Sequence, residues 1–260
     1  MTVRKSLSSG SFGHPENDSR ELMQNDLKRP APCVAVLIPV YNNAKTLGDV
    51  LEGVLTQVHS VLVVDDGSTD EIADVLGSFR ESIQVCRYSR NQGKGAALST
   101  GFRLLYEQGF THAITLDADG QHFPSNLPAF LVATSRQPAA LLVGQRDMRG
   151  AGAPFRSRFG LTCSNFALSL LAGLRIEDSQ AGFRAYPLNE TCALGLRGRR
   201  YDLEMEVLMK AGWNGLPVVP LRIDVTYTPR EGRVSHFRPL RDFARIVWMV
   251  LRLLMEGRRH

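Results

Sequence analysis

Long apolar runs are missing from this sequence. A helix that spans a bilayer needs about 18 consecutive apolar residues, and the longest uncharged stretch, from Phe159 to Leu174, is interrupted by Thr162, Ser164, Asn165 and Ser169. The first residues also lack the apolar segment of a secretory signal. We therefore expect a protein that does not cross a membrane.

Cysteine is scarce as well. Cys33, Cys86, Cys163 and Cys192 lie far apart and form no CxxC pair, so neither a zinc site nor a disulfide framework is indicated. We expect these side chains to be small buried groups of a protein in a reducing cytosol.

Basic charge is concentrated at one end. The net charge of +5 equals that of the segment from Arg230 to His260 alone, which holds eight arginines and three acids. A nucleic-acid-binding protein would carry basic residues across a face of its folded domain, with a recognisable motif. We therefore predict no nucleic-acid partner and expect the tail to meet an anionic membrane surface.

The length of 260 residues, 43% of them hydrophobic, suits one large domain. Residues 1–32 are rich in Ser, Gly, Asn and charge, and we expect a disordered leader there. Residues 33–229 are expected to form the folded domain. Residues 230–260 would add a basic loop and an amphipathic helix.

Short apolar runs rich in β-branched residues alternate with segments of helical length. The runs are typical of buried parallel strands and are Val34–Val40, Val61–Asp65, Ile83–Tyr88, Ala113–Asp117 and Leu141–Gly144. The helical segments are Ala44–Gln57, Asp70–Arg80, Gly95–Gln108 and Ser125–Ser135. Asp70 and Ser125 are expected to cap two of them. Right-handed crossovers then predict an α/β fold with a mostly parallel, Rossmann-like sheet flanked by helices.

The pattern changes after Gly150. The sequence there predicts a loop over Asp178–Arg184, a helix near Tyr201–Ala211 and a strand over Val219–Tyr227.

Polar turns follow three of the predicted strands. They are Pro39–Asn43, Asp65–Asp70 and Asp117–His122. Ligands of parallel sheets bind at the carboxyl ends of the strands, so we expect the three turns to converge on one edge.

The turn after the fourth strand indicates a metal site. Asp117 and Asp119 are two residues apart at a strand end, and their carboxylates suit Mg²⁺ or Mn²⁺. Such a cation can bridge the phosphates of a nucleotide diphosphate and neutralise the leaving group. An EF-hand is excluded because His122 and Pro128 would replace its glycine and glutamate. A plain solvated turn is the alternative.

The other turns are ambiguous by themselves. Asp66 and its neighbours place a carboxylate where it could accept hydrogen bonds from a nucleobase or ribose. Asp70 is equally suited to cap a helix. Arg90–Gly95 resembles a phosphate cradle but lacks the order of a P-loop or a dinucleotide fold. A packed glycine turn and a ligand loop remain equal alternatives.

Six motifs occur in one order, namely PVYNN, VVDDGSTD, NQGKGAA, LDADGQH, DSQAGFR and PREGRVSHF. Together they span roughly Cys33–Arg245 and resemble the family 2 inverting glycosyltransferases, in particular the branch of dolichol-phosphate mannose synthases and polyprenyl-phosphate glycosyltransferases. The resemblance implies a GT-A fold, a GDP- or UDP-linked sugar donor, and Mg²⁺ or Mn²⁺ as cofactor.

The resemblance also implies roles for individual residues. The metal would be held by Asp117, Asp119 and Gln121. The donor would be bound by Pro39, Tyr41, Asn43, Asp66, Asp117, Ala118, Asp119, Arg146, Arg230 and His236. Arg158 and Asp178 would meet the acceptor. Asn43 stands where the family usually has glutamate, and His236 where the synthases have lysine, so base and sugar preferences are not carried over.

Inverting transfer is a single in-line displacement at the anomeric carbon. A hydroxyl acceptor needs a general base, whereas a phosphate acceptor is already an anion. Asp178 is the candidate for that base or for orienting the acceptor, and the alternative is a turn carboxylate paired with Arg184. Of Glu204 and Glu206, we expect one to face inward and the other to be solvated.

The last segment predicts a basic amphipathic helix. At about 100° per residue, one set of side chains falls within roughly 60°, namely Arg238, Arg241, Arg245, Arg252 and Arg259. Apolar residues occupy another side, with Trp248 near the boundary, so the helix can lie in a headgroup layer. Alternatively, the apolar side packs on the catalytic domain or on a second copy, and the arginines face water.

The sequence therefore predicts a peripheral glycosyltransferase at the cytoplasmic membrane face that acts on a lipid-linked acceptor, polyprenyl phosphate or a glycolipid hydroxyl, with a homodimer as an option. A nucleotidyltransferase would carry a glycine-rich loop where PVYNN stands. The departures at Asn43 and His236 leave a non-catalytic nucleotide-sugar-binding protein as an alternative, against which Asp117 and Asp119 count.

Overall fold

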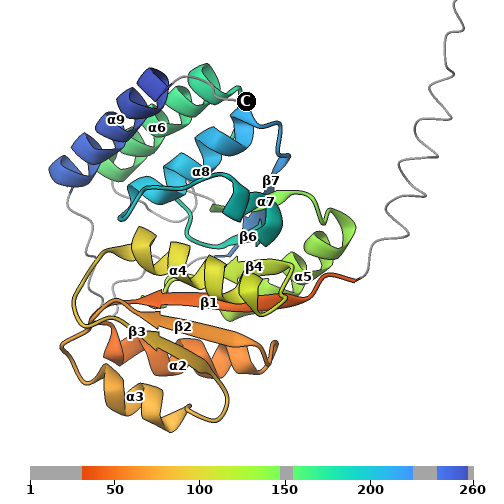
Figure 1. The fold of residues 1–260 in the computed structure, drawn as a ribbon, viewed down its shortest axis with the longest axis vertical. Coiled ribbons are helices and arrows are strands. Elements are labelled where there is room, and N and C mark those ends of the chain that lie inside the picture. Colours follow the sequence, from red (N-terminus) through yellow and green to blue (C-terminus); the bar gives the residue numbers. More distant parts are fainter. Residues whose placement is uncertain (1–30, 147–154, 225–238, 257–260) are drawn as a thin grey trace, which may run out of the picture. The chain divides into compact units, whose positions relative to one another are not determined.

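The computed structural model describes residues 31–146, 155–224 and 239–256, with the backbone alone for residues 155–160, 162, 163, 167 and 239–246. Within the unit Pro32–His260, a seven-stranded sheet has the order β3-β2-β1-β4-β6-β5-β7 (Figure 1). The strands are β1 Val34–Val40, β2 Val61–Asp65, β3 Gln84–Arg87, β4 His112–Thr115, β5 Leu141–Arg146, β6 Arg184–Pro187 and β7 Val218–Ile223. Only β6 runs antiparallel to its neighbours in the described sheet, so the predicted mostly parallel sheet is confirmed.

Helices cover both faces of this sheet. They are α2 Ala44–Leu55, α3 Ile72–Ser78, α4 Lys94–Glu107, the 3-10 turn η1 Pro124–Asn126, α5 Leu127–Arg136, α6 Phe155–Ala172, α7 Leu188–Ala193, α8 Asp202–Trp213 and α9 Pro239–Glu256. Side chains of α2, α3 and α5 form one hydrophobic core with one face of the sheet. Those of α4, α6, α7, α8 and α9 join the core on the other face.

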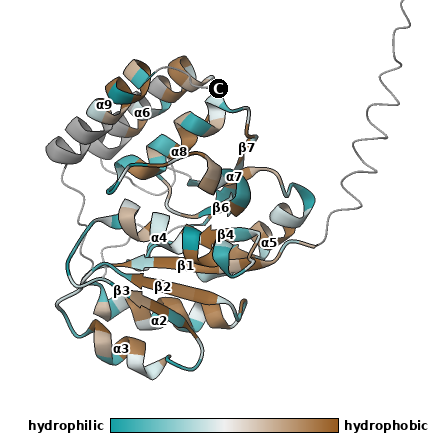
Figure 2. Ribbon diagram, in the orientation of Figure 1, coloured by the Kyte–Doolittle hydropathy of each residue, from teal (hydrophilic) through white to brown (hydrophobic). Residues whose placement is uncertain are grey.

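Strands β1 and β2 begin and end where the sequence predicts, whereas β4 covers His112–Thr115 instead of the predicted Ala113–Asp117. In β1, Ala35 and Leu37 point into one core and Val36 and Ile38 into the other, because successive side chains of a strand face opposite sides. Burial on both faces accounts for the continuous apolar runs of β1 and β2, which are coloured as hydrophobic in Figure 2.

Two predicted helix caps are wrong. Helix α3 begins at Ile72 and α5 at Leu127, and neither has a side-chain cap. Asp70 instead accepts a hydrogen bond of 2.9 Å from the backbone N–H of Ala44, at the start of α2. Ser125 lies inside the 3-10 turn η1. Both caps fail because these residues serve the turns between elements.

Strand β6 was not expected from the sequence. The segment predicted as a loop ends at Arg184, which is the first residue of β6 and pairs with Thr115 of β4 and Val143 of β5. Four residues that include a buried arginine and a proline carry no strand pattern, so only the two neighbouring strands define it.

Two expectations from the composition concern membrane spans and cysteine burial. No helix among the described residues is both long and apolar enough to span a bilayer. Cys33 and Cys192 are exposed, so the prediction of buried cysteines is wrong for these two, which lie just before β1 and in α7.

Candidate active site

The turns after β1 and β2 are joined by hydrogen bonds. Asn42 has a positive φ of 50°, and its side-chain oxygen accepts a bond of 2.8 Å from the N–H of Thr69. The hydroxyl of Ser68 accepts the N–H of Asn42 at 3.0 Å. The predicted convergence of these two turns is therefore confirmed.

Asp66 fastens the second turn to the glycine loop. Its buried carboxylate accepts the N–H groups of Gln92 at 2.6 Å and Gly93 at 2.8 Å. Burial raises the pKa of Asp66, and the two N–H bonds oppose that rise. Gly67, with a φ of 73°, lets the backbone of Arg90 approach so closely that any Cβ would collide with it. The glycine loop is thus a packed turn that Asp66 holds in place.

Lys94, the first residue of α4, lies between two carboxylates. Its ammonium is 2.7 Å from Asp117 and 3.1 Å from Glu204. Burial by itself would lower the pKa of Lys94, but the two carboxylates outweigh it and raise that pKa. Burial by itself would raise the pKa of Asp117, but the Lys94 ammonium outweighs this effect and lowers that pKa. Lys94 is part of the NQGKGAA motif, but the sequence does not indicate that it pairs with Asp117 and Glu204.

The Asp117–His122 turn belongs to the same edge. The hydroxyl of Thr46 in α2 donates to the carbonyl of Ala118 at 2.6 Å, and Asp119 accepts the N–H of Gln121 at 2.9 Å. Gly120 has a φ of 68°, which an L side chain rarely adopts. The turn after β4 therefore contacts the turn after β1, as predicted.

Asp117 and Asp119 offer the carboxylate oxygens that a hard divalent cation prefers as ligands. No group of three His, Cys, Asp or Glu side chains within the described ranges could hold a metal by itself. Mg²⁺ commonly takes one or two carboxylates and completes its shell with phosphates and water. Asp117 already pairs with one cation, the ammonium of Lys94.

Asp178 forms a bidentate ion pair with Arg146 at the end of β5. Nε and Nη2 of Arg146 donate to the two carboxylate oxygens at 2.6 and 2.8 Å, and the side chain of Asp178 is 1% exposed. The alternative pairing with Arg184 is wrong. The buried guanidinium of Arg184 donates to the carbonyls of Ser179, Ala181 and Glu204, each at 2.8 Å.

The same segment also lies close to the Asp117–His122 turn. The hydroxyl of Thr115 donates to the carbonyl of Gly182 at 2.7 Å, and a Cβ on Gly182 would collide with the carboxylate of Asp117. The chain around Asp178 is therefore brought beside Asp117, although the two aspartates are 61 positions apart in the sequence.

Glu204 and Glu206 are both buried, so the prediction that one is solvated is wrong. Glu204 faces the site and pairs with Lys94. Glu206 accepts the N–H of Gly198 at 2.6 Å and pairs with Arg252 of α9 at 3.2 Å. One glutamate therefore belongs to the site and the other to the packing of α9.

Of six further residues of the predicted site, the structure describes the side chains of three. Pro39 is buried within β1, and Tyr41 and Asn43 are half-buried beyond its end. The side-chain amide of Asn43 donates to the carbonyl of Tyr41 at 3.0 Å. Arg230 and His236 lie outside the described residues, as does the side chain of the sixth, Arg158.

His122 closes the turn on its inner side. Its ring is buried and meets the ring of Phe183 edge-on, with centroids 5.9 Å apart. Burial lowers the pKa of His122 to about 4, against a smaller opposing effect of Asp117. The ring is therefore neutral near pH 7 and adds no positive charge beside the acidic pair.

A family model described as glycosyl transferase family 2 matches residues 35–191, which is more than half of the chain. The chain belongs to glycosyltransferase family 2. Among its relatives, a polyprenol monophosphomannose synthase of Mycolicibacterium smegmatis is 32% identical over 220 residues, which are 80% of this chain and 82% of that protein. A UDP-N-acetylglucosamine–dolichyl-phosphate N-acetylglucosaminyltransferase of Methanococcus voltae is 27% identical over 216 residues, 75% of this chain and 86% of that protein.

A solved structure confirms the fold of this glycosyltransferase. Glucosyl-3-phosphoglycerate synthase from Mycobacterium tuberculosis, crystallised with Mn²⁺, UDP and glucosyl-3-phosphoglycerate, matches with a TM-score of 0.63 and 18% identity, over 94% of this chain and 86% of that one. The expected GT-A fold and the resemblance to polyprenyl-phosphate glycosyltransferases are both confirmed.

Proposed function

We propose that this glycosyltransferase moves a sugar from a GDP- or UDP-linked donor to polyprenyl phosphate at the cytoplasmic face of a membrane, as a peripheral protein. The main support is the similarity to two transferases named for polyprenol or dolichyl phosphate. The alignment with this chain covers more than four-fifths of the length of each. The joined turns of the sheet edge support the same reading.

The donor would lie across the turns after β1, β2 and β4. Tyr41, Asn43 and Asp66 would line its nucleotide pocket, with Pro39 and Ala118 as parts of the surrounding backbone. Asp117, Asp119 and Gln121 would hold the Mg²⁺ or Mn²⁺ that neutralises the charge on the departing nucleoside diphosphate. Lys94, already bound to Asp117, adds a second positive charge there.

The ion pair of Asp178 favours a phosphate acceptor over a hydroxyl acceptor. Arg146 engages both oxygens of that carboxylate, so Asp178 is placed to hold Arg146 rather than to receive the proton of an acceptor hydroxyl. A phosphate oxygen needs no deprotonation before it bonds to the anomeric carbon. The bond from that carbon to the donor's phosphate oxygen breaks with inversion, and its electron pair leaves with the nucleoside diphosphate. Asp178 would orient Arg146, and Arg158 would meet the acceptor.

Calorimetry tests the donor site first. UDP and GDP are titrated with and without Mn²⁺ into the full chain and into the Asp119→Asn variant. Metal-dependent binding of one nucleotide, lost in the variant, supports the assignment and names the base. Absence of binding by both would overturn it and favour a non-catalytic protein. Arg230 and His236 are tested in the same way by alanine substitution.

Product analysis then tests the acceptor. The purified protein is incubated with the matching nucleotide sugar and either polyprenyl phosphate or polyprenol, which lacks the phosphate. We expect product from polyprenyl phosphate alone. Transfer to polyprenol or to a glycolipid hydroxyl would show that a general base operates and would overturn the acceptor assignment.

A further inference from the structure

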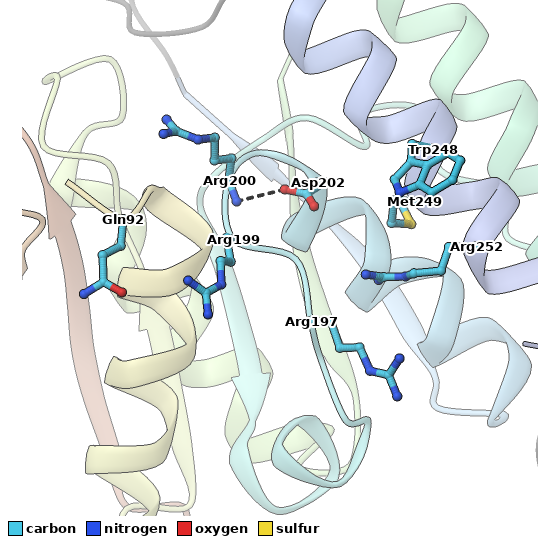
Figure 3. Close-up of a pocket in the computed structure, with 8 residues that line it drawn as sticks. All are labelled: Gln92, Arg197, Arg199, Arg200, Asp202, Trp248, Met249 and Arg252. Atoms are coloured by element: carbon cyan, nitrogen blue, oxygen red, sulfur yellow. Dashed lines mark hydrogen bonds between the residues drawn. The ribbon is translucent and has the colours of Figure 1, made fainter.

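Helices α6 and α9 present an apolar surface to solvent. Both pack on α8, and they lie next to one another in Figures 1 and 3. Phe166 and Leu170 of α6, and Trp248, Leu251 and Met255 of α9, are between 49% and 72% exposed. Their spacings of three, four and seven residues place each set on one helix face. An exposed apolar surface of this kind marks a contact site.

The other side of α9 already has its partner. Met249 and Leu253 are buried in the core against α8, and Arg252 pairs with the buried Glu206. The alternative in which the arginines of this helix face water is therefore wrong for Arg252. The outward apolar residues are additional to those that fix α9 to the domain.

A cavity of about 600 Å³ lies beside this apolar surface. It is lined by four arginines and one acid, Arg197, Arg199, Arg200, Arg252 and Asp202, and by Trp248 (Figure 3). Trp248 thus belongs both to the cavity and to the exposed apolar surface. None of the acidic residues predicted to hold the metal or the acceptor lines the cavity.

Two of the four guanidinium groups form no ion pair within the described part of the chain. Arg197 pairs with Glu256 at 2.7 Å and Arg252 with Glu206 at 3.2 Å. For Arg199 and Arg200, no described carboxylate lies within ion-pairing distance. The Nε of Arg252 is buried and has no hydrogen-bond partner among the described groups. The cavity therefore offers unused donors to an anion.

We infer that the cavity binds the phosphate of anionic phospholipids while the apolar surface of α6 and α9 lies in the headgroup layer. Guanidinium groups match phosphate with two parallel hydrogen bonds, and apolar side chains beside them would enter the acyl boundary. A small soluble anion would bind in the cavity without contacting the apolar surface of α6 and α9. The inference rests on the membrane association in the proposed function, and it assigns that association to the cavity arginines and to the apolar surface of α6 and α9.

This docking would bring the sheet edge to the lipid surface. Gln92, which also lines the cavity, donates its backbone N–H to Asp66 of the predicted nucleotide pocket. The lipid phosphate would therefore bind next to the glycine loop, and an acceptor that stays in the lipid layer could reach the donor without leaving it.

Vesicle sedimentation tests this inference with the full chain. Phosphatidylcholine vesicles are compared with vesicles that also contain phosphatidylglycerol, using the wild type, Arg199→Gln/Arg200→Gln and Trp248→Ser/Leu251→Ser. The control Arg80→Gln/Arg136→Gln removes the same charge from exposed arginines elsewhere. We expect the cavity variant, which lacks two basic residues, to bind anionic vesicles about thirtyfold more weakly, since each basic residue contributes about fivefold at an anionic surface. The control should change binding by less than about threefold.

Three outcomes would overturn the inference. One is an equal loss in the cavity variant and in the control. Another is a thermal shift by inorganic phosphate that needs Arg199 and Arg200 while vesicles bind unchanged, which would indicate a soluble anion. The third is a dimer that Trp248→Ser/Leu251→Ser converts to a monomer without weaker vesicle binding. Nucleotide titrations of Trp248→Ser/Leu251→Ser report separately on the donor site. A failure of the proposed function is therefore distinguishable from a failure of the membrane inference.

Discussion

The role of Asp178 can be decided by its own substitution. Asp178→Asn keeps the shape of the side chain but removes the charge that holds Arg146. If Arg146 binds the donor, nucleotide affinity should fall about tenfold, because a hydrogen bond to a charged group contributes about 1.5 kcal/mol or more. We expect kcat/KM to fall in parallel and to keep its dependence on pH.

The measurements are nucleotide calorimetry and the pH profile of kcat/KM, with unfolding curves to confirm that the variant folds. A general base would give a different result. Nucleotide affinity would then stay at the wild-type value while turnover and the acidic limb of the pH profile disappeared.

His122 should make the protein less stable in acid. Its pKa is about 4 in the folded protein, against 6.5 in the unfolded chain. Above pH 6.5 neither the folded nor the unfolded chain binds a proton there, and the full stability is present. As the pH falls toward 4, the unfolded chain binds the proton first, so stability is lost by about 3 kcal/mol.

Urea unfolding at neutral pH and near pH 4 checks this prediction in the wild type and in His122→Gln. The variant cannot titrate at this position, so its loss of stability over the same range should be smaller by most of that amount. Equal losses in the two proteins would show that other groups account for the acid sensitivity.

Residue types at the site could be predicted from the sequence, but their contacts could not. Asp117 and Asp119 were recognisable because they are closely spaced after a strand, and hard cations prefer carboxylates. The pairing of Lys94 with Asp117, and the bond from Gln92 to Asp66, join residues more than twenty positions apart. Such contacts depend on the order of the strands, which one sequence does not reveal.

At the scale of elements, α4 packs so closely on β1 that one glycine is required. A Cβ on Gly101 would collide with both methyl groups of the buried Leu37. Gly101→Ala should therefore lower the free energy of unfolding by about 1–3 kcal/mol, although alanine is the better helix former.

Gly77→Ala in α3 is the matched control. Nothing lies within 4 Å of a Cβ at that position, so the substitution should raise the free energy of unfolding by about 0.5–1 kcal/mol. Urea unfolding measures both variants. If Gly101→Ala were also stabilising, Leu37 would be free to move and the close packing of α4 on β1 would not be required.

Elements with a strong local pattern were predicted and those defined by neighbours were not. β1 and β2 are continuous β-branched runs because both faces of the sheet are covered. β6 has four residues and pairs on both sides, so its conformation follows from β4 and β5. The boundaries of α3 and α5 shifted because Asp70 and Ser125 serve the adjacent turns.

At the scale of the whole molecule, Glu206 connects three parts of the chain. Its carboxylate is fully buried and binds Gly198 before α8, Lys210 within α8 and Arg252 in α9. The amphipathic pattern predicts a helix within residues 230–260 but not this inward contact, because only the folded domain supplies the buried acid.

Removing that acid should loosen α9. Glu206→Ala leaves Lys210 and Arg252 without their buried partner, and such a loss lowers the free energy of unfolding by about 3–5 kcal/mol. Glu256→Ala, at the end of α9 itself, is the control. It breaks an exposed pair with Arg197, which is worth about 1 kcal/mol or less. Urea unfolding and the rate of proteolysis within α9 are the measurements. Faster cleavage confined to Glu206→Ala would show that the acid holds the helix, whereas equal behaviour of both variants would show that Met249 and Leu253 suffice.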